Sequence, residues 1–307
     1  MLLVSSDLSA VFDVVEHATL LKRLFCSLGV SGIAYSWIKS YLGGRTQSVR
    51  KGSYSSAVTS CSVSVPQGSV LGPLLFSAYK SPLSTVAKFH QVFQQQYADD
   101  TQLYVALSPI NYFNELITLQ SCLSSLHVWF CENGMALNPS KSDAILFGTA
   151  QRLETMFSLT FVKIADSAMQ FSDTIKILGV TLDSNLTLGP HIKAISKSCF
   201  YHIRSFRQIR LSRDRSMAIA VASALVSAKH DYANSIFFGC LQKHIFRLQR
   251  VQHALARVVM QQVYCSSSST EVLKQLHWLP IKWRIKFKLA TSTYKTCLLY
   301  TSPSPRD

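Results

Sequence analysis

Residues 89–107 read Phe-His-Gln-Val-Phe-Gln-Gln-Gln-Tyr-Ala-Asp-Asp-Thr-Gln-Leu-Tyr-Val-Ala-Leu. Two β-like runs, 89–97 and 101–107, flank the adjacent acids Asp99 and Asp100, which predicts two strands joined by a tight acidic turn. Two neighbouring ionised carboxylates repel each other and lose hydration on burial, so this turn cannot point into the core. A bound divalent cation would relieve the repulsion, and an ordinary polar turn is the alternative at this point.

The segments around this hairpin alternate between strand and helix patterns. Apolar residues at helical spacing predict helices, and β-rich runs predict strands. In chain order we expect a strand at 2–6, helices at 17–28 and 33–42, a hairpin within 46–65, helices at 71–81 and 112–133, strands at 144–147 and 175–182, and a last basic helix at 278–296. This order predicts an α+β domain followed by an all-helical one.

Charge is distributed unevenly along the chain. The 31 Lys and Arg and the 16 Asp and Glu give a formal net charge of +15. Residues 1–190 hold 12 of each sign, whereas residues 191–290 hold 17 cations and 3 acids. Such asymmetry indicates a polyanionic partner, nucleic acid before an anionic membrane, with a solvated basic face as the alternative. Helical spacing puts several cations on one face, so we expect nucleic-acid contacts from Lys193, Lys197, Arg204 and Arg207.

Composition excludes several classes of protein. Hydrophobic residues make up 48% of the chain, so it is not a disordered tail. The longest mostly apolar run, 217–228, is too short to cross a membrane, and the N-terminus lacks the basic region of a signal peptide. The eight Cys are scattered without a CxxC pair, which fits neither a zinc site nor a disulfide scaffold. We therefore expect a protein of the nucleus or cytoplasm that is not secreted and has no membrane partner.

Three carboxylates, Asp7, Asp99 and Asp100, lie at a predicted strand end or turn. Mg²⁺ prefers oxygen ligands and keeps coordination places for phosphate oxygens and water. Two Mg²⁺ ions, or Mn²⁺ in their place, held by these acids would activate an attacking 3′-hydroxyl and stabilise a pyrophosphate leaving group. The three acids are therefore the candidate catalytic and metal-binding residues.

Six short segments stand out for their sequences and for their order. They are 7–13 (DLSAVFD), 65–76 (VPQGSVLGPLLF), 97–100 (YADD), 134–141 (GMALNPSK), 177–180 (ILGV) and 276–280 (LHWLP). In this order they resemble motifs A, B, C and D, the primer grip and a thumb-region signature of the reverse transcriptases of non-LTR (LINE-type) retrotransposons. The second segment is the most specific, and six in the family order are hard to obtain by chance.

The resemblance implies a role for each candidate residue. Asp7 and Asp99 would be the principal metal ligands, with Asp100 beside them. The backbone carbonyl of Leu8 would complete one metal shell. Phe12 would be the steric gate that excludes a 2′-hydroxyl, although an isolated Phe is more simply a core aromatic. The remaining implied roles are contacts to the template base and incoming nucleotide by Gln67 and Gly68, to the triphosphate by Lys141, and to the primer end by Leu178 and Gly179.

The resemblance also implies an architecture, the right hand of a polymerase in partial form. We expect an α+β palm over residues 1–186, an all-helical basic thumb-like region over 187–290, and a disordered or foreign tail over 291–307. Only six residues precede Asp7, so we expect the family's fingers region and endonuclease domain to be missing. Ser64 stands where a Gly is common before the motif B segment.

The implied activity is that of an RNA-directed DNA polymerase of a retrotransposon. Its partners would be an RNA template, a DNA primer or nicked target DNA, and deoxynucleoside triphosphates. Two alternatives remain open from the sequence. One is an inactive fragment of a transposable element that only binds nucleic acid, and the other is an RNA-dependent RNA polymerase.

Overall fold

The computed structural model describes residues 1–9, 12–66, 68–108, 111–155, 161–164, 167–262 and 268–301. The chain divides into two compact units, Met1–Ile175 and Lys176–Asp307. The expected break after residue 186 falls inside the second unit, between β14 (Val180–Asp183) and α7 (Gly189–Ile209). The assignment of functional domains to these residue ranges stays a prediction.

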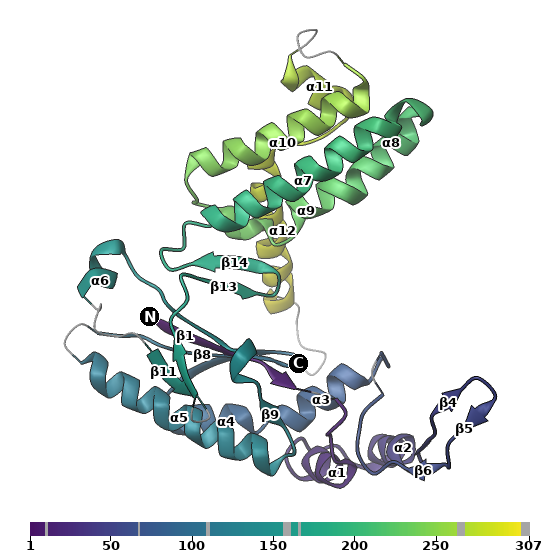
Figure 1. The fold of residues 1–307 in the computed structure, drawn as a ribbon, viewed down its shortest axis with the longest axis vertical. Coiled ribbons are helices and arrows are strands. Elements are labelled where there is room, and N and C mark those ends of the chain that lie inside the picture. Colours follow the sequence, from purple (N-terminus) through teal and green to yellow (C-terminus); the bar gives the residue numbers. More distant parts are fainter. Residues whose placement is uncertain are drawn as a thin grey trace. The chain divides into compact units, whose positions relative to one another are not determined.

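The first unit is built on an antiparallel sheet with the strand order β10-β1-β8-β7 (Figure 1). Strand β1 (Leu2–Ser6) is central, since it pairs with β10 (Asp143–Leu146) on one side and with β8 (Asp100–Val105) on the other. Strand β7 (Phe93–Tyr97) pairs with β8. The predicted hairpin around the acidic pair is thereby confirmed, with Ala98 and Asp99 at its turn.

Helices α4 (Leu83–Phe89) and α5 (Tyr112–Glu132) lie along one face of this sheet (Figure 1). Helix α3 (Gly72–Lys80) precedes them and buries its apolar face in the same core. Pro73 lies in the first turn of α3, and Gly134 with a φ of +70° follows α5. Both helices agree with the expected ranges 71–81 and 112–133 to within one residue at each end. The remaining helices of this unit are α1 (His17–Cys26), α2 (Gly32–Leu42) and α6 (Ala150–Thr155).

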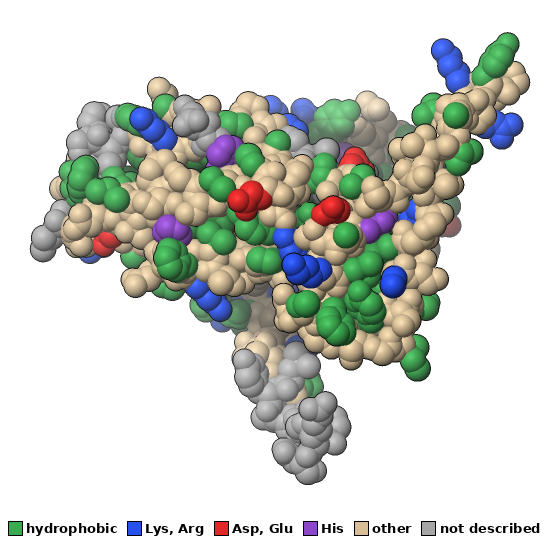
Figure 2. Space-filling view, turned by 90° about the horizontal axis from the view of Figure 1, so that it is seen from below, with side chains coloured by type: hydrophobic (Ala, Val, Ile, Leu, Met, Phe, Trp, Pro, Cys, Tyr) green, Lys and Arg blue, Asp and Glu red, His purple; other side chains and the backbone are tan. Residues whose placement is uncertain are grey.

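Short two-stranded ribbons complete the first unit. They pair β2 (Leu8–Ser9) with β9 (Ala136–Leu137), β3 (Thr46–Gln47) with β6 (Thr59–Ser60), β4 (Arg50–Lys51) with β5 (Tyr54–Ser55), and β11 (Phe161–Ile164) with β12 (Ser167–Gln170). The β4–β5 ribbon, the predicted hairpin centred near Gly52, projects from the unit with cations near its end (Figure 2). The 3₁₀ turn η1 (Pro139–Lys141) follows β9.

The second unit is mainly helical. It opens within β13 (Thr174–Ile177), continues through β14 and α7, and then contains η2 (Arg210–Ser212), α8 (Arg215–Ala222), η3 (Ser223–Ser227), α9 (Ala228–Asp231), η4 (Asn234–Phe237), α10 (Gln242–Met260), α11 (Ser269–Gln275) and α12 (Ile281–Thr301). In the part of the chain that the structure describes, no helix is long and apolar enough to cross a membrane.

Two sequence expectations for this unit are wrong. The single strand expected at 175–182 is two strands, because Leu178 and Gly179 adopt φ values of +45° and +82° and turn the chain back on itself. The tail expected to be disordered or foreign is helical over 291–301, where α12 continues in one helix, so only the expectation of disorder is wrong there. Residues 302–307 lie outside the described residues, and a foreign origin of the tail stays a prediction.

Candidate active site and nucleic-acid interface

The β1–β8 register brings two of the three candidate acids to the same end of the sheet. Ser6 is paired with Thr101 and Ser5 with Gln102, so the next position outward sets Asp7 opposite Asp100. Asp99 directly precedes Asp100 on the β7–β8 turn. Asp7 and Asp100, 93 positions apart in sequence, therefore become neighbours because the buried central strand β1 is followed by an acid.

The electrostatic state of Asp100 reflects this crowding of like charge. Burial raises the pKa of Asp100, and the nearby carboxylates of Asp99 and Asp7 raise it further, whereas Lys80 opposes the shift. Among the described residues, no group of three His, Cys, Asp or Glu side chains is arranged to hold a metal ion. The carboxylates of Asp7, Asp99 and Asp100 are nevertheless of the donor type that Mg²⁺ prefers, because they are hard oxygen ligands. A bound cation would also relieve their mutual repulsion.

A buried lysine lies beneath the acidic turn. Lys80, the last residue of α3, is 0% exposed, and its Nζ donates to the carbonyl oxygens of Ala98 (2.9 Å) and Asp99 (3.1 Å) and to Oγ1 of Thr101 (2.8 Å). Burial lowers the pKa of Lys80 to about 8, while Asp99 and Asp100 act in the opposite direction. Lys80 lies outside every motif segment of the sequence.

Asp7 is tied through its backbone to the segment that resembles motif D. The Asn138 N–H donates to the Asp7 carbonyl (3.0 Å), and the Asp7 N–H donates to Oγ of Ser142 (3.2 Å). Nζ of Lys141 lies 3.9 Å from Oδ2 of Asp7, and its side chain is 69% exposed. Leu8 follows in β2 and pairs with β9. The structure therefore brings the predicted residue Lys141 to the acidic end of the sheet.

The candidate gate residue Phe12 is half-buried. Its ring centroid lies 4.8 Å from that of Phe76 on α3, and its carbonyl accepts the Val65 N–H (2.9 Å). Gly68 has a φ of +82° and open space where a Cβ would stand, which agrees with a backbone that a ligand could approach. Gln67 lies outside the described residues.

The candidate primer-grip residues form the β13–β14 turn of the second unit. The carbonyl of Leu178 accepts a hydrogen bond from the Tyr232 hydroxyl. The φ of +82° favours glycine at position 179, whereas a Cβ there would make only ordinary van der Waals contact with the Tyr232 ring, at 3.5 Å. Tyr232 thus supports this turn, a role that its sequence position gave no means of predicting.

The four candidate nucleic-acid contacts lie on one helix. Lys193, Lys197, Arg204 and Arg207 are exposed on α7, opposite the buried residues Ile192, Cys199, Ile203 and Phe206. The sequence prediction that they share one exposed helical face is therefore confirmed. Their contact with nucleic acid stays a prediction.

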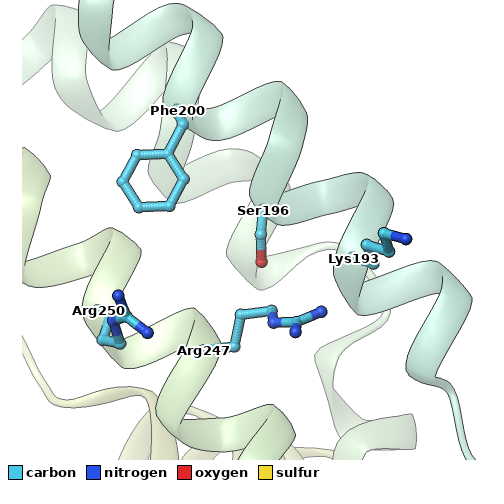
Figure 3. A pocket seen from close by; sticks show the side chains of 5 residues that line it. All are labelled: Lys193, Ser196, Phe200, Arg247 and Arg250. Carbon is cyan, nitrogen blue, oxygen red and sulfur yellow. The ribbon is translucent and has the colours of Figure 1, made fainter.

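A groove of about 250 Å³ lies between α7 and α10 (Figure 3). It is lined by Lys193, Ser196 and Phe200 from α7 and by Arg247 and Arg250 from α10, and we call these five residues the α7–α10 groove. The three cations are exposed, and no carboxylate of the described residues lies within 4.0 Å of any of them. The groove is therefore an unneutralised cationic surface around one aromatic ring.

The three acids between residues 191 and 290 are engaged within the second unit. Asp214 caps α8 by accepting the Met217 N–H (2.6 Å), Asp231 binds Arg284, and Glu271 lies 3.8 Å from Lys274. Each of these acids therefore interacts with a local partner, and among the described residues none pairs with the cations of the α7–α10 groove.

Some site residues outside the motif segments still have a recognisable position in the sequence pattern. Lys80 follows Phe76 by four residues, so a lysine falls on the face of α3 that also carries the buried Phe76 and Leu75. Arg247 and Arg250 alternate with the buried residues Leu248 and Val251 on an amphipathic helix. These patterns indicate which side of a helix a cation takes, but they do not identify the partner across the fold.

The sheet, its acidic end and the associated motif segments define a class of polymerase. The chain matches the family model described as reverse transcriptase (RNA-dependent DNA polymerase) over residues 1–182. It belongs to this family, for which a palm-like fold of the first unit is the expected architecture. The resemblance to the reverse transcriptases of non-LTR retrotransposons is confirmed by its curated relatives, which are polymerases of mobile elements.

The relatives are all much longer than this chain. It is 31% identical over 229 residues to the probable RNA-directed DNA polymerase from transposon BS of Drosophila melanogaster, covering 71% of this chain and 24% of the relative. The RNA-directed DNA polymerase from mobile element jockey of the same fly is 30% identical, covering 62% and 20%. The chain thus spans about a quarter or less of the length of these relatives.

A solved structure of telomerase from Candida albicans in complex with a fragment of telomeric RNA also matches. The TM-score is 0.47 at 10% sequence identity, and the match covers 91% of this chain and 51% of the telomerase chain.

Proposed function

We propose that this chain catalyses RNA-directed DNA synthesis, adding deoxynucleotides from deoxynucleoside triphosphates to the 3′-hydroxyl of a DNA primer on an RNA template. The observation that carries the proposal is the β1–β8 register, which ends with Ser6 opposite Thr101 and so brings the next residue, Asp7, close to Asp100 and the Asp99 turn, in a chain of the reverse transcriptase family. Clustered carboxylates at a strand end match the ligands that phosphoryl transfer requires.

Asp7, Asp99 and Asp100 would hold two divalent ions, Mg²⁺ or Mn²⁺. Such ions, when bound, activate a hydroxyl nucleophile and neutralise charge on the phosphates. Lys141 is an exposed cation 3.9 Å from Asp7, which supports a role in binding the triphosphate. Phe12 would select against ribonucleotides, and its contact with Phe76 would hold its ring in a fixed position.

The second unit would act as the thumb. The exposed cations of α7 would bind backbone phosphates without reading bases, which suits a polymerase that must accept any sequence. The Leu178–Gly179 turn would contact the primer end, and Tyr232 would keep that turn in its conformation. The absence of a free acid beside the three cations of the α7–α10 groove supports this assignment within the described residues.

Primer extension on an RNA template with Mg²⁺ tests the proposal. Asp99→Asn should lower extension by roughly a hundredfold or more, because bound metal contributes several kcal/mol of transition-state stabilisation. RNA binding should remain, since Asp99 belongs to the acidic turn rather than to the cationic helices. Asp143→Asn is the matched control, as Asp143 is an exposed acid on β10 of the same sheet.

Three results would contradict the proposal. Normal extension by Asp99→Asn would show that the catalytic acids are misassigned. No extension by the natural chain, together with salt-sensitive RNA binding, would leave a protein that only binds nucleic acid. Preferential use of ribonucleotides would identify an RNA-dependent RNA polymerase instead.

A further inference from the structure

Lys80 is a fully buried cation without an ion pair. Its side chain is 0% exposed, and no carboxylate of the described residues lies within 4.0 Å of its Nζ. An ammonium group has three N–H donors and no acceptor. Lys80 uses all three, on the carbonyls of Ala98 and Asp99 and on the hydroxyl oxygen of Thr101.

Burying an ammonium group is costly unless its hydrogen bonds are fully satisfied. Two of the acceptors of Lys80 belong to the turn between β7 and β8, so this cost is offset by fixing the turn. Ala98 has a φ of +50°, a left-handed conformation that residues with a Cβ adopt at an energetic cost. The lysine therefore bonds the carbonyl of the one strained residue in the turn.

The third acceptor extends the connection to the neighbouring strand. Thr101 is buried and paired with Ser6 of β1, and Oγ of Ser6 donates to the Thr101 carbonyl (3.1 Å). Asp7 is the residue after Ser6. The Lys80 ammonium group thus bonds directly to the turn that carries Asp99. Through Thr101 it is also connected to Ser6, the residue before Asp7.

We propose that Lys80 is a positioning residue of the active site, which holds the Ala98–Asp99 turn in its left-handed conformation and thereby directs the carboxylates of Asp99 and Asp100 toward the metal ions. The proposal rests on the function proposed above, in which these acids bind metal. This positioning role differs from a purely structural one, because Lys80 would influence metal binding and catalysis through the backbone conformation of Ala98. An ordinary buried lysine would stabilise the fold without such coupling.

The coupling gives a sharp test. Lys80→Met keeps the length of the side chain and removes the donors. Ala98→Gly makes a φ of +50° accessible without strain, so it should compensate for the lost lysine. The matched control is Lys88→Met, because Lys88 is an exposed lysine on α4 of the same unit. All variants, including Lys80→Met/Ala98→Gly, are made in the full chain.

Primer extension and Mn²⁺ binding, followed by electron paramagnetic resonance, are the readouts. Lys80→Met should lower kcat and Mn²⁺ affinity by about tenfold, the factor that corresponds to 1.4 kcal/mol, with the KM for deoxynucleotides and the RNA affinity unchanged. Ala98→Gly should restore part of both losses. Lys88→Met should behave as the natural chain. The proposal is overturned if Lys80→Met loses nothing or if its loss persists undiminished with Gly at position 98.

The free energy of unfolding in urea tests the role of Lys80 independently of the proposed polymerase activity. If the natural chain neither extends a primer nor binds Mn²⁺, the proposed function fails, and the link between Lys80 and the turn is judged from stability alone. Lys80→Met should then destabilise less when Ala98→Gly is present, and additive effects would refute the link. If Lys80→Met does not fold, Thr101→Val takes its place, since it removes one acceptor at similar volume and should show the same compensation by Ala98→Gly.

Discussion

Removing positive charge from the α7–α10 groove should weaken RNA binding in a salt-dependent way. The double variant Arg247→Gln/Arg250→Gln deletes two exposed guanidinium groups that have no carboxylate partner within 4.0 Å among the described residues. Each phosphate contact contributes about 0.7 to the slope of log affinity against log salt for a single strand, and about 0.9 for a duplex. If each arginine binds one phosphate, the slope should therefore become shallower by about 1.4 to 1.8.

Fluorescence anisotropy of a labelled RNA, titrated at several KCl concentrations, measures that slope. The control Arg213→Gln/Lys295→Gln removes the same charge from exposed positions outside the groove. If only the net charge of the protein matters, both double variants should show the same change in slope. If the groove contacts phosphates, only Arg247→Gln/Arg250→Gln should make the slope shallower. Equal slopes for the two double variants would refute the assignment.

Phe200, the aromatic residue of the α7–α10 groove, allows a second and independent test of nucleic-acid binding there. Phe200 lies on α7 among the cations and is 37% exposed (Figure 3). Stacking of a base on an aromatic ring contributes about 1 to 3 kcal/mol and does not depend on counterions. Phe200→Ala should therefore weaken binding of a single strand at every salt concentration and leave the slope unchanged. A changed slope would mean that the substitution had displaced the neighbouring cations.

Three further predictions concern stability and substrate choice. Ser64 has a φ of +84°, so Ser64→Gly should stabilise the chain by about 1 kcal/mol in urea unfolding, whereas Ser60→Gly on β6 should destabilise it. Burial, aided by Arg284, lowers the pKa of His230 to about 4, against 6.5 in a model peptide. As the pH falls, His230 is protonated in the unfolded state before it is protonated in the folded state. The free energy of unfolding should therefore fall by roughly 3 kcal/mol between pH 6.5 and pH 4. His230→Leu should abolish this part of the pH dependence, measured by urea unfolding at several pH values. Phe12→Ala should admit ribonucleotides, measured as the ratio of ribonucleotide to deoxynucleotide incorporation, and an unchanged ratio would exclude a gating role.

The parts of the fold that depend on local pattern could be predicted from the sequence. Adjacent acids between two β-rich runs predicted the β7–β8 hairpin, and apolar residues at helical spacing predicted α3 and α5 near their observed bounds. The strand expected at 175–182 failed, because a β-branched and apolar run gives no sign that Leu178 takes a positive φ. A residue whose conformation is set by a distant contact, here the Tyr232 hydroxyl, is not predictable from its neighbours in sequence.

The candidate site was predictable only in part for a related reason. Motif resemblance identified Asp7, Asp99 and Lys141, and the structure brings them to one end of the sheet. Lys80 resembles nothing in those motifs, and its importance depends on three acceptors 18 to 21 residues away in sequence. Helical periodicity could show that a lysine shares a face with Phe76, but which groups lie against that face is decided by the packing of α3 on the sheet.

Two residues with a positive φ, Ser64 and Ala98, differ in their surroundings. The carbonyl of Ser64 contacts Nε2 of His17 (2.7 Å), and its φ of +84° is one that glycine adopts more readily. Ala98 is held by a buried lysine that gives up hydration to bond the turn. A positive φ that a fully buried ammonium group stabilises beside the candidate acids is expected at a functional site, whereas Ser64 lies outside the acidic turn. Ser64→Gly should therefore leave the extension rate of the chain unchanged while it raises stability, and Ala98→Gly should alter the extension rate most when Lys80 is absent.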